Sequence, residues 1–163
     1  MEDRYLFKAK RVDWREFPEK EWWITGYYAL GFNVYEQPVH LIFEPTSMFF
    51  SHGETDGWAE IDNHTICQCT GLKDNNGKLI WENDIIKDLF SDVYAQIKYG
   101  SYQSCFDSTK TEHVGFYVDW SVKYTKRYRK DLGYWINMVD AEIAGNAFDN
   151  VELLESEGEY DRE

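Results

Sequence analysis

Residues 60–87, EIDNHTICQCTGLKDNNGKLIWENDIIK, carry the densest pattern of strand and turn signals in the chain. Side chains alternate over residues 65–70 with the two-residue period of a β-strand. Residues 74–77 read Asp-Asn-Asn-Gly, and an Asn-Gly pair favours a type I′ turn or a loop that closes in the left-handed conformation. Strand residues resume at Lys78 and again at Ile85. We therefore predict three short strands joined by tight turns.

The same residues resemble the signature of the YopX family, small proteins encoded by phages and prophages. That signature runs through Thr-Gly-Leu-x-Asp-x-Asn-Gly-Lys to Ile-aromatic-Glu-Gly-Asp-Ile-apolar-Lys. The positions that fit it are Gln68, Thr70, Gly71, Leu72, Asp74, Asn76, Gly77, Lys78, Ile80, Trp81, Glu82, Asp84, Ile85 and Lys87. Two positions depart, because Asn83 replaces the usual Gly and Cys69 replaces a common aromatic residue. Asn tolerates the left-handed conformation, so we expect the bend at Asn83 to form.

The resemblance implies a mainly β fold with a small SH3-like barrel, additional strands and little helix. We expect residues 1–58 to form a β segment that packs on the barrel and residues 59–154 to form the barrel. Residues 155–163 are acidic and nearly free of apolar groups, so we expect a disordered tail.

The resemblance implies no activity, so we assign the motif a structural role as a turn. Its residues are Thr70, Gly71, Leu72, Asp74, Asn76, Gly77, Glu82 and Asp84. Short acidic side chains in turns commonly accept backbone N–H groups, and we expect Asp74 and Asp84 to do so.

The composition limits the classes of function. Of the 163 residues, 43% are hydrophobic and 18% are aromatic, and the net charge is −13. Aromatic residues fit half-buried sheet surfaces and also protein interfaces. The negative charge argues against a general duplex-DNA binder, since phosphate contacts need clustered Lys and Arg. The negative charge either keeps the protein soluble or gives it a surface that mimics nucleic acid and occupies a nucleic-acid-binding host protein.

Alternation and turn residues predict further strands along the chain. Gly26, inside one of them, suggests a bulge or a close backbone approach. Pro38 and Pro45 suggest edge positions for the strand between them. Asn150 or Asp149 is expected to cap a short helical turn through Leu154. The predicted strands are residues 4–10, 21–29, 32–35, 39–43, 93–99, 116–124, 134–138 and 141–145.

Cysteine use and hydropathy predict a cytoplasmic protein, and the resemblance to the YopX family implies a bacterial host cell. The three cysteines have no framework spacing, so we expect reduced thiols. No N-terminal apolar run resembles a signal peptide. No apolar stretch approaches the ~18 residues of a membrane span.

Two groups of residues suggest metal chemistry. Cys67 and Cys69 share a strand face near His64, but zinc needs three or four ligands, so we expect both thiols to fill space in the core. The second group would suit a metal-dependent phosphodiesterase. Its members are Glu54, Asp56, Glu60, Asp62 and His64. Acidic side chains occupy surface loops by default and no catalytic signature is present, so we predict no metal, no cofactor and no enzyme activity, with the phosphodiesterase as an alternative.

A basic run interrupts the acidic chain at residues 123–130. It contains Lys123, Lys126, Arg127, Arg129 and Lys130, interleaved with two tyrosines. Cations together with stacking rings suit single-stranded nucleic acid. We therefore hold a nucleic-acid module as an alternative to the main prediction, which is a non-enzymatic protein-interaction or self-assembling β module that forms a homo-oligomer.

Overall fold

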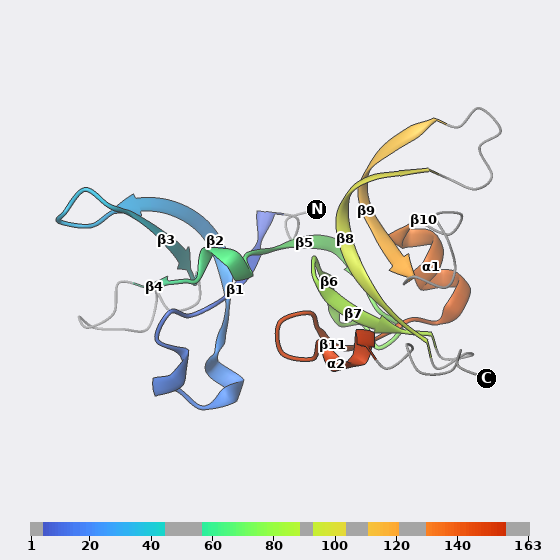
Figure 1. Cartoon of the computed structure of the whole chain (residues 1–163), viewed down its shortest axis with the longest axis horizontal. Coiled ribbons are helices and arrows are strands. Elements are labelled where there is room, and N and C mark those ends of the chain that lie inside the picture. Colours follow the sequence, from blue (N-terminus) through green and yellow to red (C-terminus); the bar gives the residue numbers. More distant parts are fainter. Residues whose placement is uncertain (1–4, 45–56, 89–92, 104–110, 121–129, 156–163) are drawn as a thin grey trace. The chain divides into compact units, whose positions relative to one another are not determined.

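A computed structural model describes residues 5–44, 57–88, 93–103, 111–120 and 130–155 (Figure 1). The described chain is mainly β and forms two antiparallel sheets, which confirms the predicted fold class at this level. Neither sheet closes into a barrel among the described strands.

The chain divides into two compact units, Met1–Cys69 and Thr70–Glu163. This division falls inside the strand β5 (Cys67–Lys73). The strand β4 (Trp58–Glu60) belongs to the first unit because it pairs with β3 (Pro38–Phe43). The sequence-based division after residue 58 stays a prediction.

The first unit is an antiparallel sheet. Its strand order is β4, β3, β2 (Trp23–Phe32), β1 (Phe7–Lys10) and the first residues of β5. Three short 3₁₀ turns, Trp14–Glu16, Glu19–Glu21 and Asn63–Thr65, connect these strands. The core consists of Ala9, Ile24, Ile42 and Ile61.

Gly26 allows a close approach between strands, as predicted. A Cβ atom at this position would lie 1.9 Å from the carbonyl oxygen of Phe43. Gly26 directly precedes the Tyr27–Phe43 pair at which β2 begins to pair with β3, and only glycine fits there without moving the backbone.

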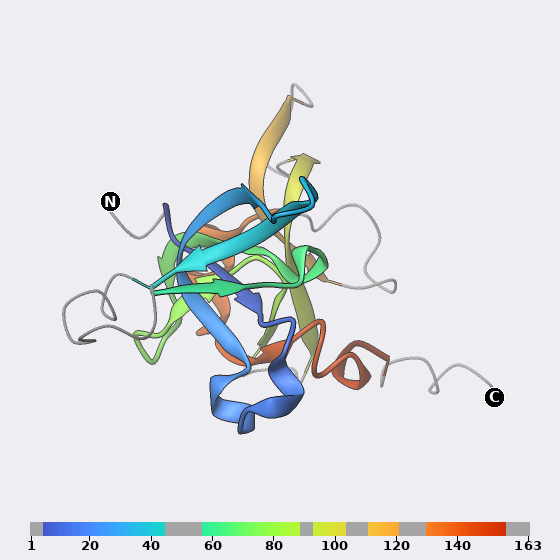
Figure 2. The same ribbon diagram turned by 90° about the vertical axis from the view of Figure 1, so that its left-hand side faces the viewer.

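The predicted separate strand at residues 32–35 is wrong. β2 continues through Gly31 to Phe32, and the chain then turns back into β3, as the blue-to-cyan hairpin of Figure 2 shows. The Oδ1 atom of Asn33 accepts hydrogen bonds from the backbone N–H groups of Tyr35 and Gln37 at 2.9 and 3.0 Å. This acceptor stabilises a turn where apolar Val34 and Tyr35 suggested a strand.

The edge position predicted from Pro38 is also wrong. β3 pairs with β2 on one side and with β4 on the other. Pro38 is tolerated because it is the first residue of β3. In addition, β4 pairs with β3 only at Leu41 to Phe43, so it does not pair with Pro38.

The second unit contains a five-stranded antiparallel sheet. Its order is β10 (Lys130–Asp131), β9 (Glu112–Trp120), β8 (Tyr94–Gln103), β7 (Asp84–Lys87) and β11 (Glu142–Asn146). β8 and β9 are long and curved in Figure 1. β6 (Leu79–Trp81) lies beside the Thr70–Lys73 part of β5. The core of this unit is Ile80, Ile86, Ala95, Ile97, Val118, Trp120, Leu132 and Ala141.

The burial of β8 confirms its predicted one-sided alternation. Ala95 and Ile97 are buried, whereas Tyr94, Gln96 and Lys98 between and beside them are only partly so. In β9 the structure describes Glu112–Trp120, and the predicted continuation over residues 121–124 lies outside the described residues.

Residues 134–138, predicted as a strand, lie in the helix α1 (Leu132–Val139). Leu132, Trp135 and Ile136 follow the i, i+3, i+4 spacing of a helix face, and all three pack in the second core. Trp135 packs edge-on against Trp120 with ring centroids 5.1 Å apart. The aromatic content suggested a strand, but burial of this face favours the helix. The predicted short helical turn is present as α2 (Glu152–Glu155).

Thr70, Gly71 and Leu72, which the motif assigned to a turn, lie inside a strand, since β5 runs on to Lys73. Gly71 takes a φ of 75° within the strand, a conformation that glycine adopts without strain.

Candidate functional site

The Asp74–Lys78 turn of the signature is organised by one buried carboxylate. Asp74 is only 6% exposed, and its Oδ1 atom accepts the N–H groups of Asn76 and Lys78 at 3.0 and 2.8 Å. Its Oδ2 atom accepts the N–H of Ile143 in β11 at 3.2 Å. Gly77 closes the turn with a φ of 80°, while neither Asn75 nor Asn76 has positive φ. The turn therefore closes in the left-handed conformation and is not type I′.

The Glu82–Asp84 bend is likewise stabilised by a buried carboxylate. Asp84 is 2% exposed, and its Oδ2 atom accepts the N–H of Trp81 at 2.9 Å. Asn83 takes a φ of 64°, as predicted for the residue that replaces Gly. Its backbone N–H donates to Ile97 and its carbonyl oxygen accepts from Ala147, so the bend is tied to two other segments.

The side chain of Thr70 also bonds to backbone groups. The hydroxyl of Thr70 donates to the carbonyl oxygen of Ile80 at 2.8 Å and accepts from the N–H of Leu72 at 3.1 Å. The carboxylates of Asp74 and Asp84 thus accept backbone N–H groups, as predicted.

The cysteines of β5 point into the protein. Cys67 and Cys69 are each 1% exposed and are free thiols, whereas His64 is exposed. The Sγ of Cys67 donates to the carbonyl oxygen of Thr65 at 3.3 Å. In the part of the chain that the structure describes, no three His, Cys, Asp or Glu side chains come together to hold a metal ion.

Several predicted site residues lie outside the described residues. They are Glu54 and Asp56 of the acidic set and Lys123, Lys126, Arg127 and Arg129 of the basic run. Lys130 lies in β10, where it pairs with Val118 of β9.

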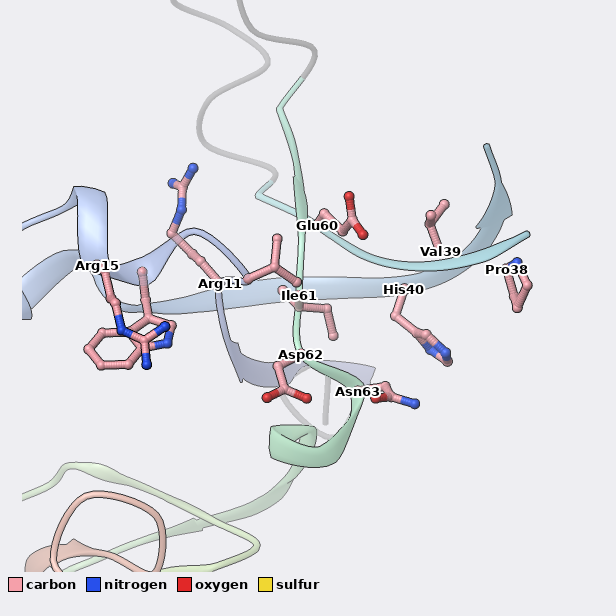
Figure 3. Close-up of a pocket in the computed structure, with 11 residues that line it drawn as sticks. Arg11, Arg15, Pro38, Val39, His40, Glu60, Ile61, Asp62 and Asn63 are labelled. Carbon is pink, nitrogen blue, oxygen red and sulfur yellow. The ribbon is translucent and has the colours of Figure 1, made fainter. Parts of the chain in front are cut away.

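The first unit contains an open pocket of about 600 Å³, which lies in the volume range of small-molecule sites. Figure 3 shows Arg15 on one side, Pro38 and His40 on the other, and Ile61 and Asp62 between them. The complete lining is Arg11, Val12, Trp14, Arg15, Pro38, Val39, His40, Glu60, Ile61, Asp62 and Asn63.

The two arginines of the pocket differ in their partners. Arg11 binds the carboxylate of Asp13 through two nitrogens, at 2.8 and 3.2 Å, and this ion pair lowers the pKa of Asp13. Arg15 is exposed, and its guanidinium carbon lies 4.5 Å from the ring centroid of Trp14. Arg15 makes no ion pair with the described residues. It is therefore the cation of this pocket that is available to a ligand.

Trp14 is held in place by neighbouring residues. Its ring meets the ring of Trp22 edge-on, with centroids 4.5 Å apart. The ammonium group of Lys10 lies 4.4 Å from the Trp14 ring and 4.6 Å from the Trp22 ring. These cation–π contacts fix the wall on which Arg15 stacks.

The acidic residues of the pocket are Glu60 and Asp62, which lie on either side of Ile61 (Figure 3). Asp62 precedes the 3₁₀ turn Asn63–Thr65, and its Oδ1 atom accepts the N–H of His64 at 3.0 Å. Its Oδ2 atom and the Glu60 carboxylate make no hydrogen bond with the described residues. His40 lies beside Ile61 and uses Nδ1 for the hydroxyl of Tyr28 at 2.8 Å, which leaves Nε2 on the ring's other side.

Sequence reasoning singled out Glu60 and Asp62 but missed Trp14, Arg15 and His40. The missed residues come from two separate segments, the 3₁₀ turn Trp14–Glu16 and β3, and the sequence contains no periodic or motif signal that brings them together.

A comparison with protein-family models adds the last observation. The model described as YopX protein matches residues 43–155. The chain belongs to the YopX family.

The YopX match covers the signature and all described strands of the second unit, and it also includes β4 of the first unit and α2. Of the pocket, it covers Glu60, Ile61, Asp62 and Asn63, but not the residues that come from before position 43. No curated protein matches the sequence. Within the described ranges, no helix has the length and apolar content needed to cross a membrane.

Proposed function

We propose that this YopX-family chain is a non-enzymatic β module that self-assembles through the β2–β3 hairpin. The observation that supports it is the exposure of large apolar side chains around the hairpin turn. Phe32 is 69% exposed, Val34 91% and Tyr35 79%. Such side chains gathered at one place typically mark an interaction surface. The proposal includes the expected phage or prophage origin and the cytoplasm of a bacterial host as the place of action.

The charge distribution favours a second copy of the chain as the partner of this hairpin. Residues 27–38 contain one charged residue, Glu36, whereas 29% of the whole chain is charged. A symmetric contact between two hairpins would bury apolar side chains against each other. It would also keep the strongly acidic remainder of the two copies apart, which lowers their repulsion.

Sedimentation velocity over a range of protein concentrations tests the proposal. We expect the wild-type chain to form a homo-oligomer as the concentration rises. The double variant Phe32→Ser/Tyr35→Ser should remain monomeric. Val114→Ser is the matched control, because Val114 is 67% exposed but lies on β9, and it should associate like the wild type. A wild-type chain that stays monomeric at all concentrations would refute self-assembly.

We also propose that residues 59–154 form an SH3-like barrel. A barrel would require the outer strands of the five-stranded sheet, β10 and β11, to find further backbone partners. Slow amide exchange along the outer edges of both strands in solution would support closure, and fast exchange there would contradict it.

A further inference from the structure

We propose that the pocket of the first unit binds a short peptide with free ends, through Arg15 at the peptide carboxylate and through Asp62 at its ammonium group. This goes beyond the self-assembly proposed above, because neither residue lies in the apolar hairpin turn.

The opposite charges of the pocket select this class of ligand. A pure anion such as a phosphate ester would meet two carboxylates, Glu60 and Asp62. A pure cation would meet the guanidinium of Arg15, and like charges repel. A zwitterion satisfies both sides, because it presents one charge of each sign.

The individual groups match a peptide in chemistry. The planar guanidinium of Arg15 can donate two parallel hydrogen bonds to a carboxylate. The Oδ2 atom of Asp62 can accept from an ammonium group without disturbing the Oδ1 bond to His64. The side-chain amide of Asn63 and Nε2 of His40 can exchange hydrogen bonds with peptide groups.

The size and apolar part of the pocket favour a peptide over a single small ion. Its volume of about 600 Å³ exceeds what a bare ammonium or carboxylate group would fill. Val12, Pro38, Val39 and Ile61 supply apolar surface between the charged groups, suitable for small peptide side chains.

Isothermal titration of trialanine tests the proposal. The protein is the full-length Phe32→Ser/Tyr35→Ser double variant, so that the result does not depend on self-assembly. We expect trialanine with both ends free to bind. N-acetylation should remove the contact with Asp62, and C-amidation the contact with Arg15, so each should weaken binding at least about tenfold.

Two variants and one control locate the site. Arg15→Gln should weaken binding of free trialanine but barely change binding of its C-amide. Asp62→Asn keeps an oxygen that can cap the turn, and it should weaken free trialanine but barely change the N-acetyl form. Lys20→Gln is the control, because the Lys20 side chain is 81% exposed and does not line the pocket. Equal binding of free and doubly blocked trialanine, or no binding of the free peptide at millimolar concentration, would overturn the proposal.

Discussion

Two hairpin turns of this protein use the same arrangement of hydrogen bonds but differ at one residue. In both, the first side-chain oxygen, of Asn33 or of Asp74, accepts the N–H groups two and four residues later. In both, the fourth residue has a left-handed backbone, with φ of 60° at Glu36 and 80° at Gly77. Glycine adopts this conformation without a Cβ penalty, whereas glutamate does not.

The substitution Glu36→Gly should therefore stabilise the protein. Relief of the left-handed strain is expected to raise the free energy of unfolding by about 1 kcal/mol. Part of this gain is offset because glycine increases the conformational entropy of the unfolded chain. Gly77→Ala should lower it by about 1 kcal/mol. A Cβ at Gly77 meets no atom within 4 Å, so the loss reports the backbone alone. Urea unfolding of both variants measures the changes, and equal signs for the two would contradict this explanation.

Removal of the Asp74 side chain should lower the free energy of unfolding more than Gly77→Ala does. Asp74→Ala deprives three backbone N–H groups of their acceptor, and we expect a loss of roughly 2 kcal/mol in the free energy of unfolding. Asp74→Asn retains an oxygen for Asn76 and Lys78, so it should cost less. Urea unfolding compares the two variants, and an Asn variant as unstable as the Ala variant would show that the charge matters more than the turn bonds.

The Arg11–Asp13 ion pair should make the stability of the protein depend on pH. Asp13 has a lowered pKa because Arg11 donates hydrogen bonds to its carboxylate. The stabilisation is therefore present above the unfolded-state pKa of Asp13 and is lost as the pH falls through the folded-state pKa. The side chain of Asp13 is 38% exposed, so solvent screening keeps the effect small.

Carboxyl NMR titration checks this pair directly. The Asp13 pKa should rise towards its ordinary value in Arg11→Gln and should stay low in the control Lys20→Gln. An Asp13 pKa that is unchanged in Arg11→Gln would assign the shift to another cause.

At the scale of elements, strands with clear local signals could be predicted from the sequence. The alternation in β8 and the turn residues at Asp74–Gly77 both specify their structure within a few residues. Helix α1 could not be predicted in this way, since its aromatic residues also suit a strand and burial of one helix face decides the outcome. The pocket was missed for a related reason: its residues are distant in sequence, and only the folded sheet brings them together.

The packing of α1 can be tested by comparing its two faces. Leu132 is 1% exposed in the second core, so Leu132→Ala should lower the free energy of unfolding by about 2–5 kcal/mol. Met138 is 56% exposed, and Met138→Ala should change it by no more than about 0.5 kcal/mol. Urea unfolding gives both values. Similar losses for the two variants would be inconsistent with the helix and its buried face.

At the scale of the whole molecule, the net charge of −13 acts on every encounter between two copies. Self-assembly through an apolar hairpin must overcome this repulsion, and salt screens it. Contacts between a basic segment and nucleic acid respond in the opposite way, because salt weakens them. The salt dependence therefore separates the proposed self-assembly from the alternative that uses residues 123–130.

We expect self-association to strengthen as the salt concentration rises from about 50 to about 500 mM, because the Debye length shortens over this range. Sedimentation velocity at each concentration measures the effect. The same protein should not shift a labelled single-stranded oligonucleotide even at low salt. Association that weakens with salt, or a shift of the oligonucleotide, would favour the nucleic-acid alternative.

The two thiols of β5 give this protein built-in reporters of its own motions. Cys67 and Cys69 are almost completely shielded from solvent, so a water-soluble maleimide can modify them only after β5 detaches from its neighbours. Their alkylation rates, followed by mass spectrometry, would time this opening in the unmodified sequence without an introduced dye or label.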